Sequence, residues 1–173
     1  MRMRTRTTQK QKPKPTALGK AVELLARQEQ SSARLKEKLR QRDYGTEEID
    51  AAIARLEERH YLNDEESCAR QYQKLYEETA MSVRQIEQKL LTRGFPSSLV
   101  RASAPKDEDR DERERNAALR SLRSRFRAAA PMAKMKQFLY RRGFSYRTCD
   151  SATATFIEEN PELLLKENES YDE

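Results

Sequence analysis

The sequence has little of what catalytic and metal sites are usually built from. It holds one histidine, two cysteines and four glycines, and it contains no tryptophan. His60, Cys68 and Cys149 are too few for a structural zinc site, and two cysteines make no disulfide framework. Both cysteines stand at apolar positions of helical patterns, so we interpret them as small buried hydrophobic residues. We therefore expect no catalytic residue, no cofactor and no metal.

Further classes of protein are excluded by the missing loops and apolar runs. No G-x-x-x-x-G-K-[ST] loop is present to hold a nucleotide phosphate. No apolar run approaches the roughly 20 residues of a membrane span. The basic amino terminus is not followed by the apolar segment of a secretory signal. These absences predict a non-enzymatic protein of the reducing cytoplasm.

Charge is abundant and unevenly placed. Charged residues make up 37% of the chain, against about 25% in an average globular protein. Hydrophobic residues make up only 36%, which favours small helical bundles over one large core. The net charge is +6, with an acid-free basic arm over residues 1–16 and an acidic tail over 158–173. A polyanion or an acidic protein surface is therefore a plausible partner.

One tract occurs three times along the chain, at residues 37–44, 88–95 and 137–144, which are 51 and 49 residues apart. In each copy an apolar i, i+4 pair is followed by an arginine, a residue suited to left-handed backbone and an aromatic. This order predicts a helix, a tight turn and a second helix. The positions that we expect to hold the repeat are Leu39, Tyr44, Leu90, Gly94, Phe95, Leu139, Gly143 and Phe144.

The period predicts an all-α fold of tandem three-helix repeats of about 50 residues each. The predicted boundaries are a disordered basic arm over 1–16, repeats over 17–61, 62–105 and 106–157, and the acidic tail over 158–173. The last repeat opens with a charged lead-in at residues 106–115, which we interpret as a solvated helix or linker.

Local patterns place the helices within these repeats. Apolar faces are predicted at Leu18, Ala21, Val22 and Leu25, at Ile49, Ala52, Ile53 and Leu56, at Cys68, Tyr72, Leu75 and Tyr76, and at Cys149, Ala152 and Phe156. Predicted N-caps are Ser31, Thr46 and either Asn63 or Asp64, and Ser82 with Gln85 forms a capping box. The apolar residues 163–165 either cover the last bundle or stay loose.

Residues 17–157 resemble the RecX family of bacterial regulators of the RecA recombinase. The resemblance is carried by Ser31 to Leu39, Ile49-Asp50 to Leu56, Tyr61 to Asp64 with Ala69-Arg70, Leu90 to Phe95, and Phe138 to Phe144. The chain departs from the family pattern at Arg34, Asp43, Ser67 and Thr79-Ala80-Met81. The resemblance implies three-helix units in an elongated, curved arrangement.

The resemblance also implies a function. Proteins like this are monomers that bind the RecA filament on single-stranded DNA, suppress its ATPase and strand exchange, and so modulate recombination, DNA repair and the SOS response. We expect partner contact through cations beside the repeated leucines, with single-stranded DNA as a further candidate partner. These cations are Lys36, Lys38, Arg40, Lys89, Arg93, Arg141 and Arg142.

Two alternatives remain open at this point. Exposed arginine on a helix is commonly just solvated, and Arg42, Arg93 and Arg142 also suit a role as C-terminal helix caps. The whole chain could instead be a general nucleic-acid-binding helical module that acts through its basic arm and its arginine-rich helices.

Overall fold

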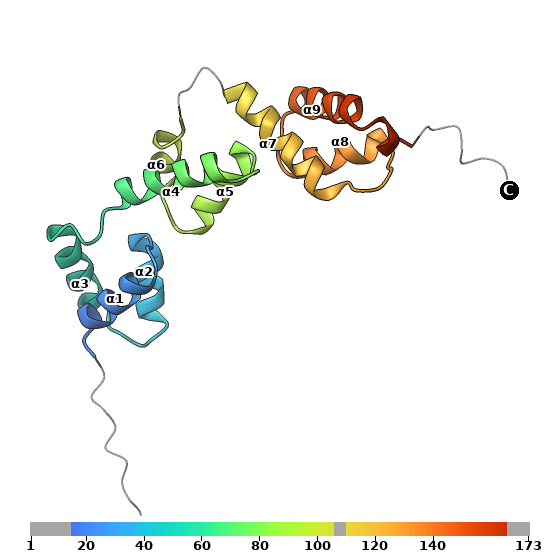
Figure 1. Cartoon of the computed structure of the whole chain (residues 1–173). Helices are drawn as coiled ribbons and strands as arrows, with labels where there is room; N and C mark the ends of the chain where they lie inside the picture. Colours follow the sequence, from blue (N-terminus) through green and yellow to red (C-terminus); the bar gives the residue numbers. More distant parts are fainter. Residues whose placement is uncertain (1–14, 106–109, 166–173) are drawn as a thin grey trace, which may run out of the picture. The chain divides into compact units, whose positions relative to one another are not determined.

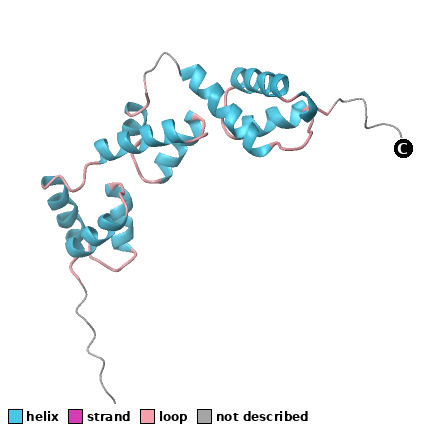
Figure 2. Ribbon diagram, viewed as in Figure 1, coloured by secondary structure: helices cyan, strands magenta, loops and turns pink. Residues whose placement is uncertain are grey.

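The structure is a computed structural model that describes residues 15–105 and 110–165. Within these residues the chain forms nine α-helices and one short 3-10 helix, with no β-strand (Figures 1 and 2). The predicted all-α repeat fold is confirmed. The helices are α1 (Ala17–Arg27), α2 (Ser32–Arg40), α3 (Thr46–Glu58), α4 (Asp64–Glu78), α5 (Val83–Thr92), α6 (Ser97–Ala102), α7 (Arg110–Arg125), α8 (Met132–Arg141), α9 (Tyr146–Glu159) and η1 (Pro161–Leu163).

Three separate hydrophobic cores organise these helices in sets of three: α1–α3, α4–α6 and α7–α9. The chain divides into two compact units. The first holds residues up to 30 and 34–62, and the second holds residues 31–33 and those from 63 on. Most of the predicted basic arm, the charges at 106–109 and the end of the acidic tail from residue 166 lie outside the described residues.

The repeated tract ends a helix in each set, as predicted. After α2, α5 and α8 the backbone turns left-handed, with φ of 59° at Asp43, 88° at Gly94 and 83° at Gly143. The aromatic that follows is buried in the core of its own set in every copy, and so is the leucine five residues before it. The residues in question are Leu39 and Tyr44, Leu90 and Phe95, and Leu139 and Phe144.

In the first unit, the prediction for α1 was partly wrong. Val22 is 50% exposed, and the buried face is formed by Ala17, Ala21 and Leu24. Glu48 on α3 accepts a hydrogen bond from the backbone nitrogen of Ala17 at 2.8 Å, so the start of α1 is turned toward α3. The predicted apolar face of α3 is buried throughout, at Ile49, Ala52, Ile53 and Leu56.

The predicted helix starts are mostly confirmed. Asn63 caps α4 by accepting hydrogen bonds from the nitrogens of Glu65 and Glu66 at 3.1 and 3.2 Å. Ser82 and Gln85 form the capping box of α5. Thr46 is the first residue of α3 and not its cap, because Gly45 holds that position without a side-chain hydrogen bond.

The end of the described chain packs onto the α7–α9 core. Leu163 contacts this core, and Leu164 pairs with Ala130 in a parallel bridge. The nitrogen of Ala130 donates to Leu163 at 2.9 Å, and the nitrogen of Leu165 donates to Ala130 at 3.2 Å. Of the two alternatives for residues 163–165, the structure therefore shows the covering one. None of the described helices combines the length and the apolar character that a membrane crossing requires.

The interpretation of the charged lead-in as solvated was wrong for two of its residues. The side chains of Arg113 and Glu114 on α7 are only 13% and 12% exposed and lie 3.0 Å apart. Arg113 donates to the carbonyl oxygens of Tyr76 and Met81, both at 2.6 Å. Ser121 donates to the carbonyl of Ala80 at 3.1 Å. The start of α7 is thus docked on the turn between α4 and α5, where its charges satisfy buried backbone groups.

A basic groove as candidate functional site

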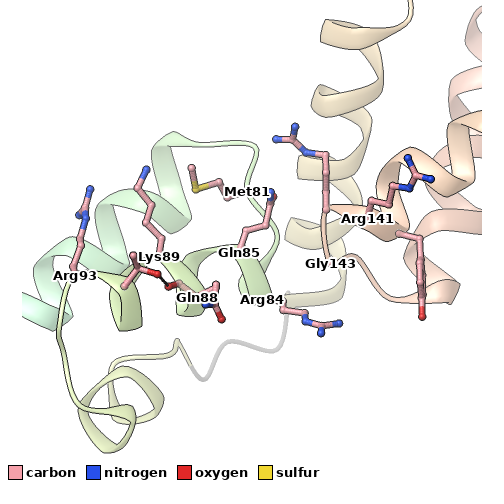
Figure 3. A pocket seen from close by; sticks show the side chains of 11 residues that line it. Met81, Arg84, Gln85, Gln88, Lys89, Arg93, Arg141 and Gly143 are labelled. Atoms are coloured by element: carbon pink, nitrogen blue, oxygen red, sulfur yellow. Dashed lines mark hydrogen bonds between the residues drawn. The ribbon is translucent and has the colours of Figure 1, made fainter.

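A groove of about 890 Å³ lies along α5 and the end of α8, entirely within the second unit. Figure 3 shows the side chains that line it, several of them ending in nitrogen. None of the lining residues is acidic. They are Met81, Arg84, Gln85, Gln88, Lys89, Thr92, Arg93, Tyr140, Arg141, Arg142 and Gly143.

Two features bring the walls of this groove together, one just before α5 and one just after α8. The hydroxyl of Ser82, just before α5, donates to the carbonyl of Arg142 at the end of α8 at 2.6 Å. Gly143 has a φ of +83°, and a Cβ there would lie 3.1 Å from the Cβ of Arg84. Because glycine lacks that atom, α5 and the turn after α8 can approach each other closely. Gly143 therefore ends α8 and lets the turn pack directly against Arg84.

Three cations of the groove are unpaired. Arg84, Lys89 and Arg141 make no side-chain hydrogen bond or ion pair to any residue that the structure describes. Arg84 and Arg141 are exposed, and Lys89 is half-buried. Like charges held near one another without a counter-charge raise the local positive potential, which favours a polyanionic or acidic ligand.

The other two cations are held by neighbours. Arg93 donates from Nη1 to Oε1 of Gln71 at 2.5 Å, and the guanidinium of Arg142 lies 5.3 Å from the centre of the Phe138 ring. Neither side chain caps its own helix in the way that Arg42 does, which donates to the carbonyl of Lys38 at 2.5 Å. The helix-cap interpretation therefore fits Arg42, whereas the Arg93 side chain bonds Gln71 on α4 and the Arg142 guanidinium lies over a ring of the last turn of α8.

Four of the seven predicted contact residues meet in this groove: Lys89, Arg93, Arg141 and Arg142. Lys36, Lys38 and Arg40 lie on α2 in the first unit and are not part of it. Lys36 is paired with Asp50 at 2.8 Å, and this hydrogen bond lowers the pKa of the Asp50 carboxyl. Arg40 lies 3.8 Å from Glu37 on the same helix. The cations of α2 are thus partly neutralised by acids of their own unit.

Sequence reasoning missed two lining residues that carry chemistry. Arg84 stands at the second position of α5, where the capping-box pattern drew attention only to Ser82 and Gln85. Tyr140 is 64% exposed and stands two residues before the Arg142-Gly143-Phe144 sequence of its copy. Its exposure could have been expected, because the apolar i, i+4 face of α8 runs through Met135 and Leu139.

Metal chemistry finds no support in the part of the chain that the structure describes. No three side chains of histidine, cysteine, aspartate or glutamate gather there as metal ligands would. Cys68 and Cys149 are buried, as predicted, and burial raises the pKa of both thiols.

Comparisons with known proteins give one matching domain and a shared fold. Residues 17–56 match the family model described as RecX, first three-helix domain. A crystal structure of RecX from Lactobacillus salivarius shares the fold with a TM-score of 0.66 at 18% identity, covering 81% of this chain and 94% of that one. A crystal structure of regulatory protein RecX gives a TM-score of 0.68 at 17% identity, covering 80% and 71%. A comparison with curated proteins gave no significant match. Residues 17–56 thus match the first three-helix domain of RecX, and the chain shares its fold with two RecX crystal structures.

Proposed function

We propose that this chain is a non-enzymatic regulator that binds the RecA recombinase filament on single-stranded DNA and inhibits its ATPase and strand exchange. Through this inhibition it would modulate recombination, DNA repair and the SOS response. The match of residues 17–56 to the first three-helix domain of RecX and the fold shared with a regulatory protein RecX support this class of function. The single observation that supports a particular binding surface is the acid-free basic groove of the second unit.

The chemistry of the groove suits binding better than catalysis. Its lining offers guanidinium, ammonium, amide and hydroxyl groups, but no carboxylate, imidazole or thiol that could act as a base or a strong nucleophile. Unpaired cations such as Lys89 and Arg141 instead attract a negatively charged surface and speed the encounter with it. A filament on single-stranded DNA presents such negative charge, and its repetition along the filament would multiply weak contacts.

The test is a titration of RecA ATPase on single-stranded DNA with the intact protein. We expect inhibition at substoichiometric ratios, because a bound regulator affects a filament of many protomers. A flat response over a broad titration would contradict the proposal. We further propose that the chain is a monomer, which light scattering of the purified chain can check. We also propose that it acts in the cytoplasm.

Variants tie the inhibition to the groove. Lys89→Glu together with Arg141→Glu should raise the half-inhibitory concentration about tenfold, since two contacting cations are reversed. The matched control is Lys74→Glu with Lys134→Glu, which makes the same change in net charge at exposed lysines outside the groove. Equal loss of inhibition in both double variants would mean that net charge matters and the groove does not.

A further inference from the structure

A second hollow adjoins the basic groove on the surface of α8. Its volume is about 360 Å³, and its lining consists of Lys136, Gln137, Tyr140, Tyr146 and Cys149. Tyr140 lines both this hollow and the basic groove. The two depressions are therefore neighbours that share one side chain.

The two tyrosines of this hollow are open to solvent. Tyr140 is 64% exposed and Tyr146 is 72% exposed, whereas Tyr44, Phe95 and Phe144, the last residues of the three repeated tracts, are buried. A tyrosine ring is a large apolar surface that normally finds cover or a partner, so two exposed rings on one hollow indicate a surface that binds something flat or apolar.

Charge changes from one depression to the other. Lys136 is the only charged residue that lines the second hollow, and it is paired with Asp150 at 2.7 Å. Pairing with Asp150 raises the pKa of the Lys136 ammonium, and the two opposite charges leave the pair close to neutral. Arg84, Lys89 and Arg141 in the first groove have no such counter-charge. One end of the surface is thus cationic, and the other is aromatic and nearly neutral.

Among negatively charged ligands, a single-stranded nucleic acid matches both ends. Its phosphates suit unpaired cations, and its unpaired bases have flat faces that stack on exposed aromatic rings. An acidic protein segment would use the cations and leave the tyrosines without a role. A duplex keeps its base faces stacked inside, so it could not use the rings either. Gln137, one helical turn before Tyr140, adds an amide that can bond a base edge.

We propose that the basic groove and the tyrosine hollow together form a binding site for single-stranded nucleic acid. Phosphates lie against Arg84, Lys89 and Arg141, and an unpaired base stacks on Tyr140, with Tyr146 as a neighbouring aromatic surface. The inference rests on the proposed function, because it takes the single-stranded DNA to be the part of the filament that this groove contacts. The basic arm is not required for the site.

The test measures binding of a fluorescently labelled oligothymidylate to the full chain by anisotropy, without any recombinase. We expect binding at low salt. The logarithm of the association constant should fall with the logarithm of the salt concentration at a slope of about −2, because three cations displace roughly 0.7 counterion each from a single strand. Arg141→Glu should weaken binding and flatten the slope. Tyr140→Ala should weaken binding roughly tenfold with the slope unchanged, while Tyr140→Phe, which keeps the ring, should bind as the parent does.

Two matched controls accompany these variants. Tyr61 is 71% exposed and lies in the first unit, so Tyr61→Ala removes an equally open tyrosine from elsewhere. Lys134→Glu reverses an exposed cation of α8 that does not line the groove. If either control lowers affinity as much as its partner variant, the proposed site is wrong.

Further outcomes separate this inference from the proposed function. A duplex of the same length that binds as tightly as the single strand, or a Tyr140→Ala variant with unchanged affinity, would overturn the stacking site. Inhibition of RecA ATPase without any oligothymidylate binding would overturn the site and leave the proposed function standing, with an acidic protein surface as the occupant of the groove. Oligothymidylate binding that depends on Tyr140, without ATPase inhibition, would support the site and contradict the proposed function.

Discussion

The carboxylate of Glu114 on α7 accepts a hydrogen bond from the backbone nitrogen of Val83, the first residue of α5, at 2.9 Å. An equivalent bond joins Asp64 on α4 to the nitrogen of Ser32, the first residue of α2, at 2.8 Å, and both atoms belong to the second unit. In each case an acid from the first helix of one set satisfies a free N–H at the start of a helix in the preceding set. The same kind of acid thus satisfies the same kind of helix start at two places in the second unit.

Glu114 should make stability depend on pH. Burial is the main cause that raises the pKa of its carboxyl above 4.5. Between the unfolded and the folded pKa the native state binds more protons than the unfolded state, so this group's contribution to stability falls as pH rises through that window. Glu114→Gln keeps an acceptor for Val83 and removes the titration. We expect the melting temperature of the parent relative to Glu114→Gln to decrease from pH 4.5 toward neutrality, as measured by thermal unfolding in a pH series. An unchanged difference across the series would contradict the assignment.

Ser82 should contribute more to stability than an ordinary N-cap. Its hydroxyl accepts from the nitrogen of Gln85 at 3.1 Å and donates to Arg142 at 2.6 Å, and the residue is fully buried. Ser82→Ala should lower the free energy of unfolding by about 2 kcal/mol, from the lost cap and the unsatisfied carbonyl together. Urea denaturation measures the change.

The control for this variant is Ser145→Ala. Ser145 caps α9 by accepting from the nitrogen of Thr148 at 3.1 Å, but it is exposed and its recorded partners lie within its own set. Its loss should cost about 1 kcal/mol. Equal costs at both positions would mean that the bond to Arg142 adds nothing.

Gly143→Ala should destabilise the second unit. A side chain at φ of +83° costs about 1–2 kcal/mol, and the added Cβ would lie 3.1 Å from Ser82 and Arg84. Gly19→Ala in α1 should have the opposite effect and stabilise by up to about 1 kcal/mol, because the new Cβ meets only the Thr16 hydroxyl at 3.4 Å. Thermal unfolding of both variants checks the signs, and a neutral Gly143→Ala would show that the turn can relax.

The two thiols should be unreactive in the folded protein. Cys68 is 0% and Cys149 is 2% exposed, and burial raises the pKa of each, so little thiolate is present or accessible. A colorimetric thiol reagent should label neither residue quickly under native conditions and both after denaturation. Rapid labelling of one thiol in the folded state would indicate local opening around it.

Much of the fold could be predicted because its determinants are local. Gly94 and Gly143 marked the helix ends, and Asn63 and Ser82 marked helix starts, since each acts on backbone within a few residues of itself. The face of α1 was harder to assign. Val22 and Leu24 both fit a helical period, and only the position of α3 decides which of them is buried.

The groove and the contacts of α7 were less predictable because they join segments that are distant in the sequence. Arg113 and Glu114 stood in a run of alternating charge, and nothing nearby indicated partners 31 to 37 residues earlier. Lys89 and Arg141 were identified as cations beside repeated leucines, but their common groove depends on the bond from Ser82 to Arg142. The same criterion also selected Lys36, whose acidic partner Asp50 lies on another helix.

The residue at the serine position differs in the third set. Ser31 and Ser82 donate their hydroxyls to the carbonyls of Arg93 and Arg142, whereas the corresponding residue before α8 is Pro131, which has neither a hydroxyl nor an N–H to offer. Directly beside it, Ala130 is paired with residues 163–165 of the same chain. The third set therefore resembles the terminal capping repeat of a repeat protein. At its edge Ala130 is already paired within the chain, and Pro131 lacks the hydroxyl that Ser31 and Ser82 donate.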